Sequence, residues 1–191
     1  MKSNPDGKPH RKFRRDWTEY GGELRKTREG RKTKRPLSYR ETMHVVLRSS
    51  KAKGDWSFRK SKHRKNILRL VEKFSVIYDV QVLSMANVGN HLHLHLKLIN
   101  RATYIAFIRA VSGAIVMTVT GISRWTKPIA DKSKFWDHRP FSRIVLSLRQ
   151  FLTLRDYVAE NQLEGQGVSR SIAWLIVEAE RGKDGNPADF G

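Results

Sequence analysis

Three histidines alternate with leucines in the segment Asn90–Leu96, which reads Asn-His-Leu-His-Leu-His-Leu. In a β-strand every second side chain points to the same side, so His91, His93 and His95 share one face and the leucines share the other. Same-face neighbours lie about 6–7 Å apart along a strand, and two imidazoles can lean together from there onto one metal ion. The pattern predicts a leucine face in the core and a histidine face that forms a metal site. The alternative is an exposed polar face that happens to use histidine.

A tyrosine and an amide share the face of a predicted helix further along the chain. Tyr157 and Asn161 are four residues apart, so on a helix they project from the same side. A tyrosine hydroxyl can attack a phosphodiester and hold one end of the strand covalently. A phenol with the ordinary pKa of about 10 is a weak nucleophile at neutral pH, so it needs a cation to polarise the phosphate. A helical tyrosine alone is usually a packing residue, but its coincidence with a histidine strand favours a nucleophile.

The charge of the chain predicts the partner. The 191 residues include 38 Lys and Arg against 18 Asp and Glu, a net charge of +20. Nucleic acid is the expected polyanion, because binding phosphates releases condensed counterions. An anionic membrane fits less well, since the basic residues are spread along the chain and no run of 18 apolar residues predicts a membrane span. The absence of cysteine excludes thiolate ligands. With no secretory signal visible, we expect a cytoplasmic protein near the nucleoid.

The distribution of basic residues suggests which segments of the chain bind nucleic acid. The composition of residues 1–38 predicts a flexible arm. We expect residues 39–166 to form the folded domain and residues 167–191 a C-terminal helix and tail. The arm is either a solvated tail or a segment that orders on nucleic acid, where Trp17 and Tyr20 could stack on bases or cap the domain. Trp136 or Trp125 could serve as a stacking platform, although core packing is the commoner role of tryptophan. Predicted contacts to the DNA backbone are Arg31, Lys32, Lys34, Arg35, Lys60, Lys62, Arg64 and Lys65.

Hydrophobic periodicity predicts the elements that position these residues. Gly89-Asn90 is a two-residue hairpin signal between two strands. The order predicts an α+β fold, a ferredoxin-like (split β-α-β) antiparallel sheet with helices on one face plus the tyrosine helix. His44 reads as a core or edge histidine, and His10, His63 and His138 as solvated or near phosphates. The predicted strands are Thr42–Arg48, Val80–Val88, His91–Leu98, Phe141–Leu146 and a possible short one at Gly121–Pro128; the helices are Phe58–Tyr78, Thr103–Val119, Leu148–Leu163 and Ser169–Arg181.

The sequence resembles a known family over about residues 20–166. Val88–Leu94 resembles the strand that carries the His-hydrophobic-His (HUH) motif of IS200/IS605-like single-tyrosine transposases. The nearest branch is the REP-associated tyrosine transposases, where Met-Pro-Asn-His-Val-His-Leu is typical. Gly89 replaces the usual proline, and His95 replaces an aliphatic residue. The other matching blocks, in the family's order, are His44–Arg48, Lys134–Trp136, Phe141–Val145 and Tyr157–Asn161.

The resemblance implies a metal-dependent enzyme that nicks single-stranded DNA, often beside a hairpin, and leaves a 5′-phosphotyrosine and a free 3′-OH. By position, Tyr157 is the nucleophile, and His91, His93 and Asn161 hold Mg²⁺ or Mn²⁺. Gln162 stands where the family often has proline and is a reserve ligand. His95 is a possible additional ligand. The implied partner is single-stranded or hairpin DNA, bound by a monomer or by a homodimer whose tyrosine acts in trans.

Two other functions remain open from the sequence. A basic ferredoxin-like module that binds nucleic acid without chemistry explains the charge and the fold, but not the histidines and the tyrosine together. A zinc hydrolase could use His91, His93 and His95. It lacks an obvious fourth partner and a general-base motif.

Overall fold

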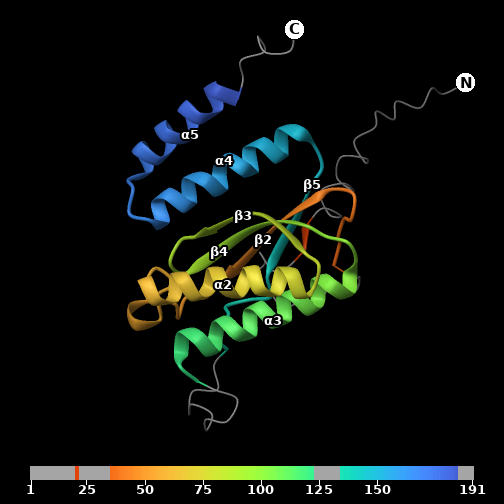
Figure 1. Ribbon diagram of the computed structural model, residues 1–191, viewed down its shortest axis with the longest axis vertical. Helices are drawn as coiled ribbons and strands as arrows, with labels where there is room; N and C mark the ends of the chain where they lie inside the picture. Colours follow the sequence, from red (N-terminus) through yellow and green to blue (C-terminus); the bar gives the residue numbers. More distant parts are fainter. Residues whose placement is uncertain (1–19, 22–34, 123–133, 185–191) are drawn as a thin grey trace, which may run out of the picture.

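The computed structural model describes residues 20–21, 35–122 and 134–184. One sheet and four helices make up this part of the chain (Figure 1). In chain order the elements are β1 Tyr20–Gly21, β2 Thr42–Arg48, the 3-10 turn η1 Gly54–Trp56, α2 Ser61–Ile77, β3 Gln81–Asn87, β4 His91–Lys97, α3 Arg101–Thr120, β5 Phe141–Val145, α4 Leu148–Gly165 and α5 Arg170–Asp184.

The sheet has the strand order β1-β5-β2-β4-β3, and all of its neighbours are antiparallel. β3 and β4 form the predicted hairpin. Gly89 lies in its turn with φ of +99°, a conformation that favours glycine. Val46 on β2 is the direct partner of His93 on β4. This register fixes which side chains share a face with the histidines.

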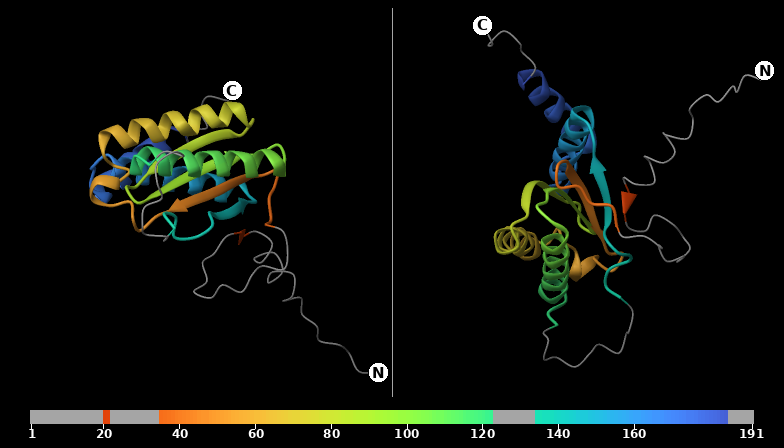
Figure 2. Two further views of the ribbon diagram at one scale, coloured as in Figure 1. Left: turned by 90° about the horizontal axis from the view of Figure 1, so that it is seen from below. Right: turned by 90° about the vertical axis from the view of Figure 1, so that its right-hand side faces the viewer.

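The two faces of the sheet carry different helices (Figures 1 and 2). α2 and α3 cover one face, whereas α4 lies on the other and α5 packs on α4. The fold class predicted from the sequence is confirmed. The main core lies between the sheet and the first pair of helices, and its fully buried members include Met43, Val45, Leu92, Leu94, Leu96, Ile67, Phe107, Val111 and Ile115.

Helix α3 owes its apolar character to this core. Among the described residues it is the one helix long and apolar enough to cross a membrane, with a hydropathy of 1.6. Here it lies against the sheet and buries one side, so core packing accounts for its composition. Asn100 caps its start by accepting a hydrogen bond from the Thr103 amide, and Gly121 ends it in the left-handed conformation.

A second, smaller cluster of buried hydrophobic residues packs α4 against the histidine face of the sheet. Ala86 of β3 and Val145 of β5 pack there with Leu154 and Val158 of α4, and Phe151 covers them. On the outer side, Arg181 of α5 donates two hydrogen bonds to the buried carboxylate of Asp156, at 3.1 and 2.7 Å. The tyrosine helix is therefore held from both sides.

The element boundaries differ slightly from the sequence predictions. The helix predicted from Phe58 begins at Ser61, because Phe58 pairs its amide with the Gly89 carbonyl in a turn. The strand predicted at Gly121–Pro128 begins with the residue that ends α3; Ile122 has no regular secondary structure, and residues 123–128 lie outside the described residues. Arg35, within the predicted arm, donates hydrogen bonds to Pro140 O and Ser142 Oγ beside β5. The domain boundaries stay predictions.

The C-terminal end of α4 approaches the hairpin too closely for a side chain. A Cβ built on Gly165 would lie 2.1 Å from the carbonyl oxygen of Asn87. Since both partners are backbone, neither can move aside without shifting the helix or the hairpin. Gly165 therefore sets how closely α4 lies on β3 and β4.

We predict that Gly165→Ala destabilises the protein by about 1–3 kcal/mol through overpacking. The matched control is Gly113→Ala in α3, where an added Cβ meets nothing within 4 Å. That change should stabilise the protein by about 0.5–1 kcal/mol, since alanine favours the helix. Urea unfolding of both variants measures the difference. Equal effects would contradict a close contact at Gly165.

Candidate active site on the histidine face

Tyr157 projects from α4 onto the histidine face of the sheet. Its ring lies edge-on to His93, with centroids 5.2 Å apart, and to His44, at 6.1 Å. Its helix neighbours Asp156 and Val158 are buried, whereas Tyr157 keeps 42% of its surface exposed. The tyrosine thus contacts the histidines and remains open to a large substrate.

His91 and His93 stand side by side at one end of β4, with ring centroids 4.8 Å apart. Each has its Nδ1 engaged. His91 Nδ1 lies 2.6 Å from Asn90 Oδ1, and His93 Nδ1 lies 3.0 Å from His44 Nε2. The Nε2 of His93 is buried and has no hydrogen-bond partner among the described residues. A buried polar atom without a partner calls for an explanation, and a coordinated cation supplies one.

Asn161 lies on α4, the helix that covers the histidine face. α4 runs antiparallel to β4: Phe151 contacts His95 at 4.9 Å, Tyr157 contacts His93, and Gly165 reaches Asn87 at the end of β3, which pairs with Leu92 near the start of β4. Asn161 follows Tyr157 by four residues, about one helical turn, so it projects from the same side of α4 as Tyr157. The Asn161 amide nitrogen donates to the Tyr157 carbonyl at 2.7 Å, which leaves the amide oxygen as its candidate metal ligand.

Gln162, the reserve ligand, faces elsewhere. It lines a groove of about 510 Å³ between α2 and the edge strand β3, together with Val76 and Val82. Gln162 therefore projects from a different side of α4 than Tyr157. Within the described ranges, no group of three or more His, Cys, Asp or Glu side chains is arranged as a metal site. A cation here would need the amide of Asn161 as well as the histidines.

The third histidine of the strand does not join the cluster. His95 is 1% exposed, its Nε2 lies 2.8 Å from Thr42 Oγ1, and Phe151 packs on its ring. The expectation that all three strand histidines form one metal site is therefore not met. His44 stands beside His93 and Tyr157 instead.

Sequence reasoning ranked His44 below the strand histidines, as a core or edge residue, and did not place it at the site. The strand Thr42–Arg48 alternates, so His44 lies on the face opposite Met43 and Val45, which are fully buried. That alternation, combined with antiparallel pairing to β4, was the available signal. His63 also differs from its prediction as a solvated residue. It is 7% exposed, and its Nδ1 contacts the Ser57 carbonyl at 3.0 Å.

Burial keeps the histidines of this face neutral. It lowers the pKa of His93 to about 3, with help from nearby His44 and His91. Burial, followed by His95 and Arg143, lowers the pKa of His44 to about 4, and burial lowers that of His95 to about 4. The pKa of His91 is lowered by burial and by Arg48. Neutral imidazoles can accept hydrogen bonds or bind metal at pH 7.

The predicted DNA contacts lie in several places. Lys60, Lys62, Arg64 and Lys65 are at the start of α2, on the opposite face of the sheet from Tyr157 (Figure 1). The guanidinium of Arg35 donates hydrogen bonds to groups of the protein itself, beside β5. Another cation, Arg48, is the cross-strand partner of His91 and has a 67% exposed side chain. Outside the described residues lie Arg31, Lys32, Lys34, Trp125, Trp17 and His10.

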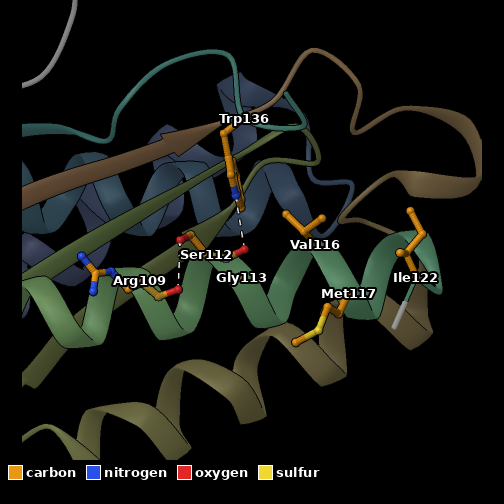
Figure 3. A pocket seen from close by; sticks show the side chains of 7 residues that line it. All are labelled: Arg109, Ser112, Gly113, Val116, Met117, Ile122 and Trp136. Carbon is orange, nitrogen blue, oxygen red and sulfur yellow. Dashed lines mark hydrogen bonds between the residues drawn. The ribbon is translucent and has the colours of Figure 1, made fainter. Parts of the chain in front are cut away.

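Trp136 belongs to the packing of α3. Figure 3 shows its ring pointing toward that helix, where Nε1 donates to the Ser112 carbonyl at 3.2 Å. The ring also contacts Phe58 and Phe135 and lines a pocket of about 480 Å³ with α3 residues. This arrangement disagrees with a stacking platform at the site, because Trp136 lies on the other side of the sheet from Tyr157.

We predict that acid weakens the fold between about pH 6.5 and pH 4. In that range the unfolded chain takes up protons at histidine, whereas His44, His93 and His95 stay neutral in the folded state. The unfolded state then binds more protons, so the free energy of unfolding falls as the pH falls. Thermal melting from pH 8 to pH 4 measures the slope. His95→Gln should make it shallower, and an unchanged slope would contradict a neutral buried His95.

Comparison with known proteins locates this fold. No protein-family model matches the sequence, and no curated protein matches it significantly. A solved structure of a REP-associated tyrosine transposase bound to a REP hairpin is similar, with a TM-score of 0.55, 10% identity, and coverage of 73% of this chain and 76% of that one. A candidate transposase of Deinococcus radiodurans R1 superposes with a TM-score of 0.43 and 14% identity over 69% of this chain and 98% of that one. The resemblance found in the sequence is thus supported by structure: the chain has the fold of a REP-associated tyrosine transposase.

Proposed function

We propose that this protein is a metal-dependent transposase that nicks single-stranded DNA and transfers the strand through a 5′-phosphotyrosine. The observation that carries the proposal is the contact between Tyr157 and His93, whose Nε2 is buried without a partner among the described residues. A potential nucleophile and a potential metal ligand, far apart in the sequence, meet on one face of the sheet. A packing role for Tyr157 explains neither its exposure nor the unpartnered nitrogen.

Three residues would hold the cation. His91 and His93 would bind through Nε2, because their Nδ1 atoms are engaged, and Asn161 through its amide oxygen. The amide oxygen and bound water suit Mg²⁺ and Mn²⁺, whereas imidazole is the more usual ligand of transition metals, so of these two ions Mn²⁺ suits the mixed set better. When bound, the ion would polarise the scissile phosphate and offset the charge that develops on it. No thiolate competes, since the chain has no cysteine.

The remaining chemistry belongs to the chain itself. The phenolic oxygen of Tyr157 attacks the phosphorus, forming an O–P bond while the bond from phosphorus to the 3′-oxygen breaks. The phenol proton passes to solvent, and the departing 3′-oxygen becomes a 3′-OH. One phosphodiester replaces another, so a second 3′-OH can reverse the step and rejoin the strand without an energy source. The exposed side of the Tyr157 ring admits the DNA.

The tyrosine would act within its own chain. Tyr157 contacts His93 of the same chain, so one molecule brings together the proposed nucleophile and metal ligand. A monomer would then suffice. The proposed partner is single-stranded or hairpin DNA, supported by the net charge of +20 and by the REP hairpin bound to the similar transposase. Such a partner would place the protein in the cytoplasm, at the nucleoid.

We expect the protein to form a denaturation-resistant adduct with labelled single-stranded hairpin DNA in Mn²⁺. Tyr157→Phe should abolish the adduct, because no phenolic oxygen remains to attack, and EDTA should abolish it in the unchanged protein. Tyr78→Phe, at the end of α2 on the other side of the sheet, is the matched control and should retain it. Gel electrophoresis under denaturing conditions measures the result.

The same assay separates the other functions. An adduct that persists in Tyr157→Phe would mean that another residue attacks. Tight, salt-sensitive binding without an adduct, tested on hairpins from the DNA flanking the gene, would favour a non-catalytic binding module. Hydrolysis that survives Tyr157→Phe and needs Zn²⁺ would favour a hydrolase.

Substitutions of the basic residues at the start of α2 test whether the DNA backbone contacts this helix. We expect the triple variant Lys62→Gln, Arg64→Gln, Lys65→Gln to bind hairpin DNA more weakly. The salt slope of log K should become shallower by about 0.7 to 0.9 for each phosphate that these side chains no longer neutralise. Lys73→Gln, further along the same helix, should leave the slope nearly unchanged. Fluorescence anisotropy between about 50 and about 300 mM salt measures the slopes. An unchanged slope in the triple variant would remove α2 from the proposed DNA contacts.

A further inference from the structure

His44 has no part in the chemistry of the proposed reaction, yet it contacts two of the residues involved. Its Nε2 lies 3.0 Å from His93 Nδ1, and the two rings are stacked with centroids 5.3 Å apart and planes 16° apart. It also meets the Tyr157 ring edge-on at 6.1 Å. His44 thus touches both the proposed ligand and the proposed nucleophile.

The hydrogen bond between the two imidazoles has only two forms when both are neutral. In one, His93 carries its proton on Nδ1 and donates to His44, so the His93 Nε2 has a lone pair. In the other, His44 donates, and His93 carries its proton on Nε2. The second form would place an N–H donor in a buried position without an acceptor among the described residues, and it would block coordination there.

His91 provides an internal comparison. Its Nδ1 lies 2.6 Å from Asn90 Oδ1, and an amide oxygen can only accept. The proton of His91 is therefore on Nδ1 and the lone pair on Nε2. With the first form at His93, both histidines present the same nitrogen. His44 then does for His93 what Asn90 does for His91.

We infer that His44 is a positioning residue: it accepts a hydrogen bond from His93 Nδ1 and so keeps the His93 Nε2 lone pair available within the site. The use of this lone pair for metal binding rests on the proposed function, whereas the hydrogen bond itself is a property of the metal-free protein. Partners that bind the second nitrogen of a metal-ligating histidine fix its tautomer and ring orientation. The other groups that approach His44 are Phe141 and Arg143 of β5 and His95 of β4, and Phe141 offers no hydrogen bond to His93 Nδ1.

The test reads the His93 tautomer directly, in protein without metal. Two-dimensional ¹H–¹⁵N spectra of the imidazole rings distinguish a protonated Nδ1 from a protonated Nε2. We expect His93 in the unchanged protein to carry its proton on Nδ1. His44→Phe keeps a ring but removes the acceptor, so His93 should shift toward the Nε2–H form. His44→Gln places an amide oxygen near the former Nε2 position and should restore the Nδ1–H form.

The matched control is His95→Gln. His95 lies on the same face but bonds Thr42 and contacts Phe151, not Tyr157, so its replacement should leave the His93 tautomer unchanged. Calorimetric titration with Mn²⁺ gives a second measurement. His44→Phe should weaken Mn²⁺ binding by about 10- to 100-fold, and His44→Gln should recover most of it. Circular dichroism establishes that each variant is folded.

The outcomes separate this inference from the proposed function. An Nε2–H tautomer in the unchanged protein, or an unchanged tautomer in folded His44→Phe, overturns the role of His44 whatever the protein does to DNA. If His44→Phe does not fold, the His93 tautomer is read in the unchanged protein and in His44→Gln. Nδ1–H in both supports the inference, and Nε2–H in either overturns it. The Nδ1–H tautomer in the unchanged protein, absent in His44→Phe and restored in His44→Gln, supports the inference even if no DNA adduct forms. In that case only the proposed reaction fails.

Discussion

The alternation of β4 is the constraint on which the rest of the structure depends. Leu92, Leu94 and Leu96 are fully buried beneath α2 and α3, and a shift of one residue in pairing would exchange them with the histidines. The register with β2 is therefore strongly determined by the hydrophobic core. Because that register also sets His44 near His93, the apolar face of the strand fixes the geometry of its polar face.

The polar face needs its own cover, and α4 supplies it. Leu154 and Val158 anchor the helix on Ala86 and Val145. Tyr157, between these anchors in the sequence, points toward the histidines while Asp156 is directed to α5. A buried carboxylate must be paired to be tolerated, and Arg155 and Arg181 provide that pairing. The contact also links α5 to the residue just before the proposed nucleophile.

The sequence predicted the strand and the helix because both patterns are local, whereas the meeting of the two was implied by the family resemblance. The alternation of His91–Lys97 and the spacing of Tyr157 and Asn161 need no knowledge of the rest of the chain. The roles of His44 and His95 could not be assigned in that way. They depend on cross-strand pairing and on the direction in which α4 crosses β4. That direction brings Phe151 into contact with His95 and Tyr157 into contact with His93. The place of Trp136 depends likewise on the packing of a distant helix.

The strand order has a consequence for how the molecule is made. β5 inserts between β1 and β2, although it follows them far along the chain, and α4 comes directly after it. Pairings that close such long loops form slowly. During synthesis His44 and His93 come together once β2 and β4 pair, but their face of the sheet stays incomplete and uncovered until the last strand and the tyrosine helix emerge. Nascent chains should therefore be the form most exposed to misfolding, and completion of the site should coincide with burial of that face.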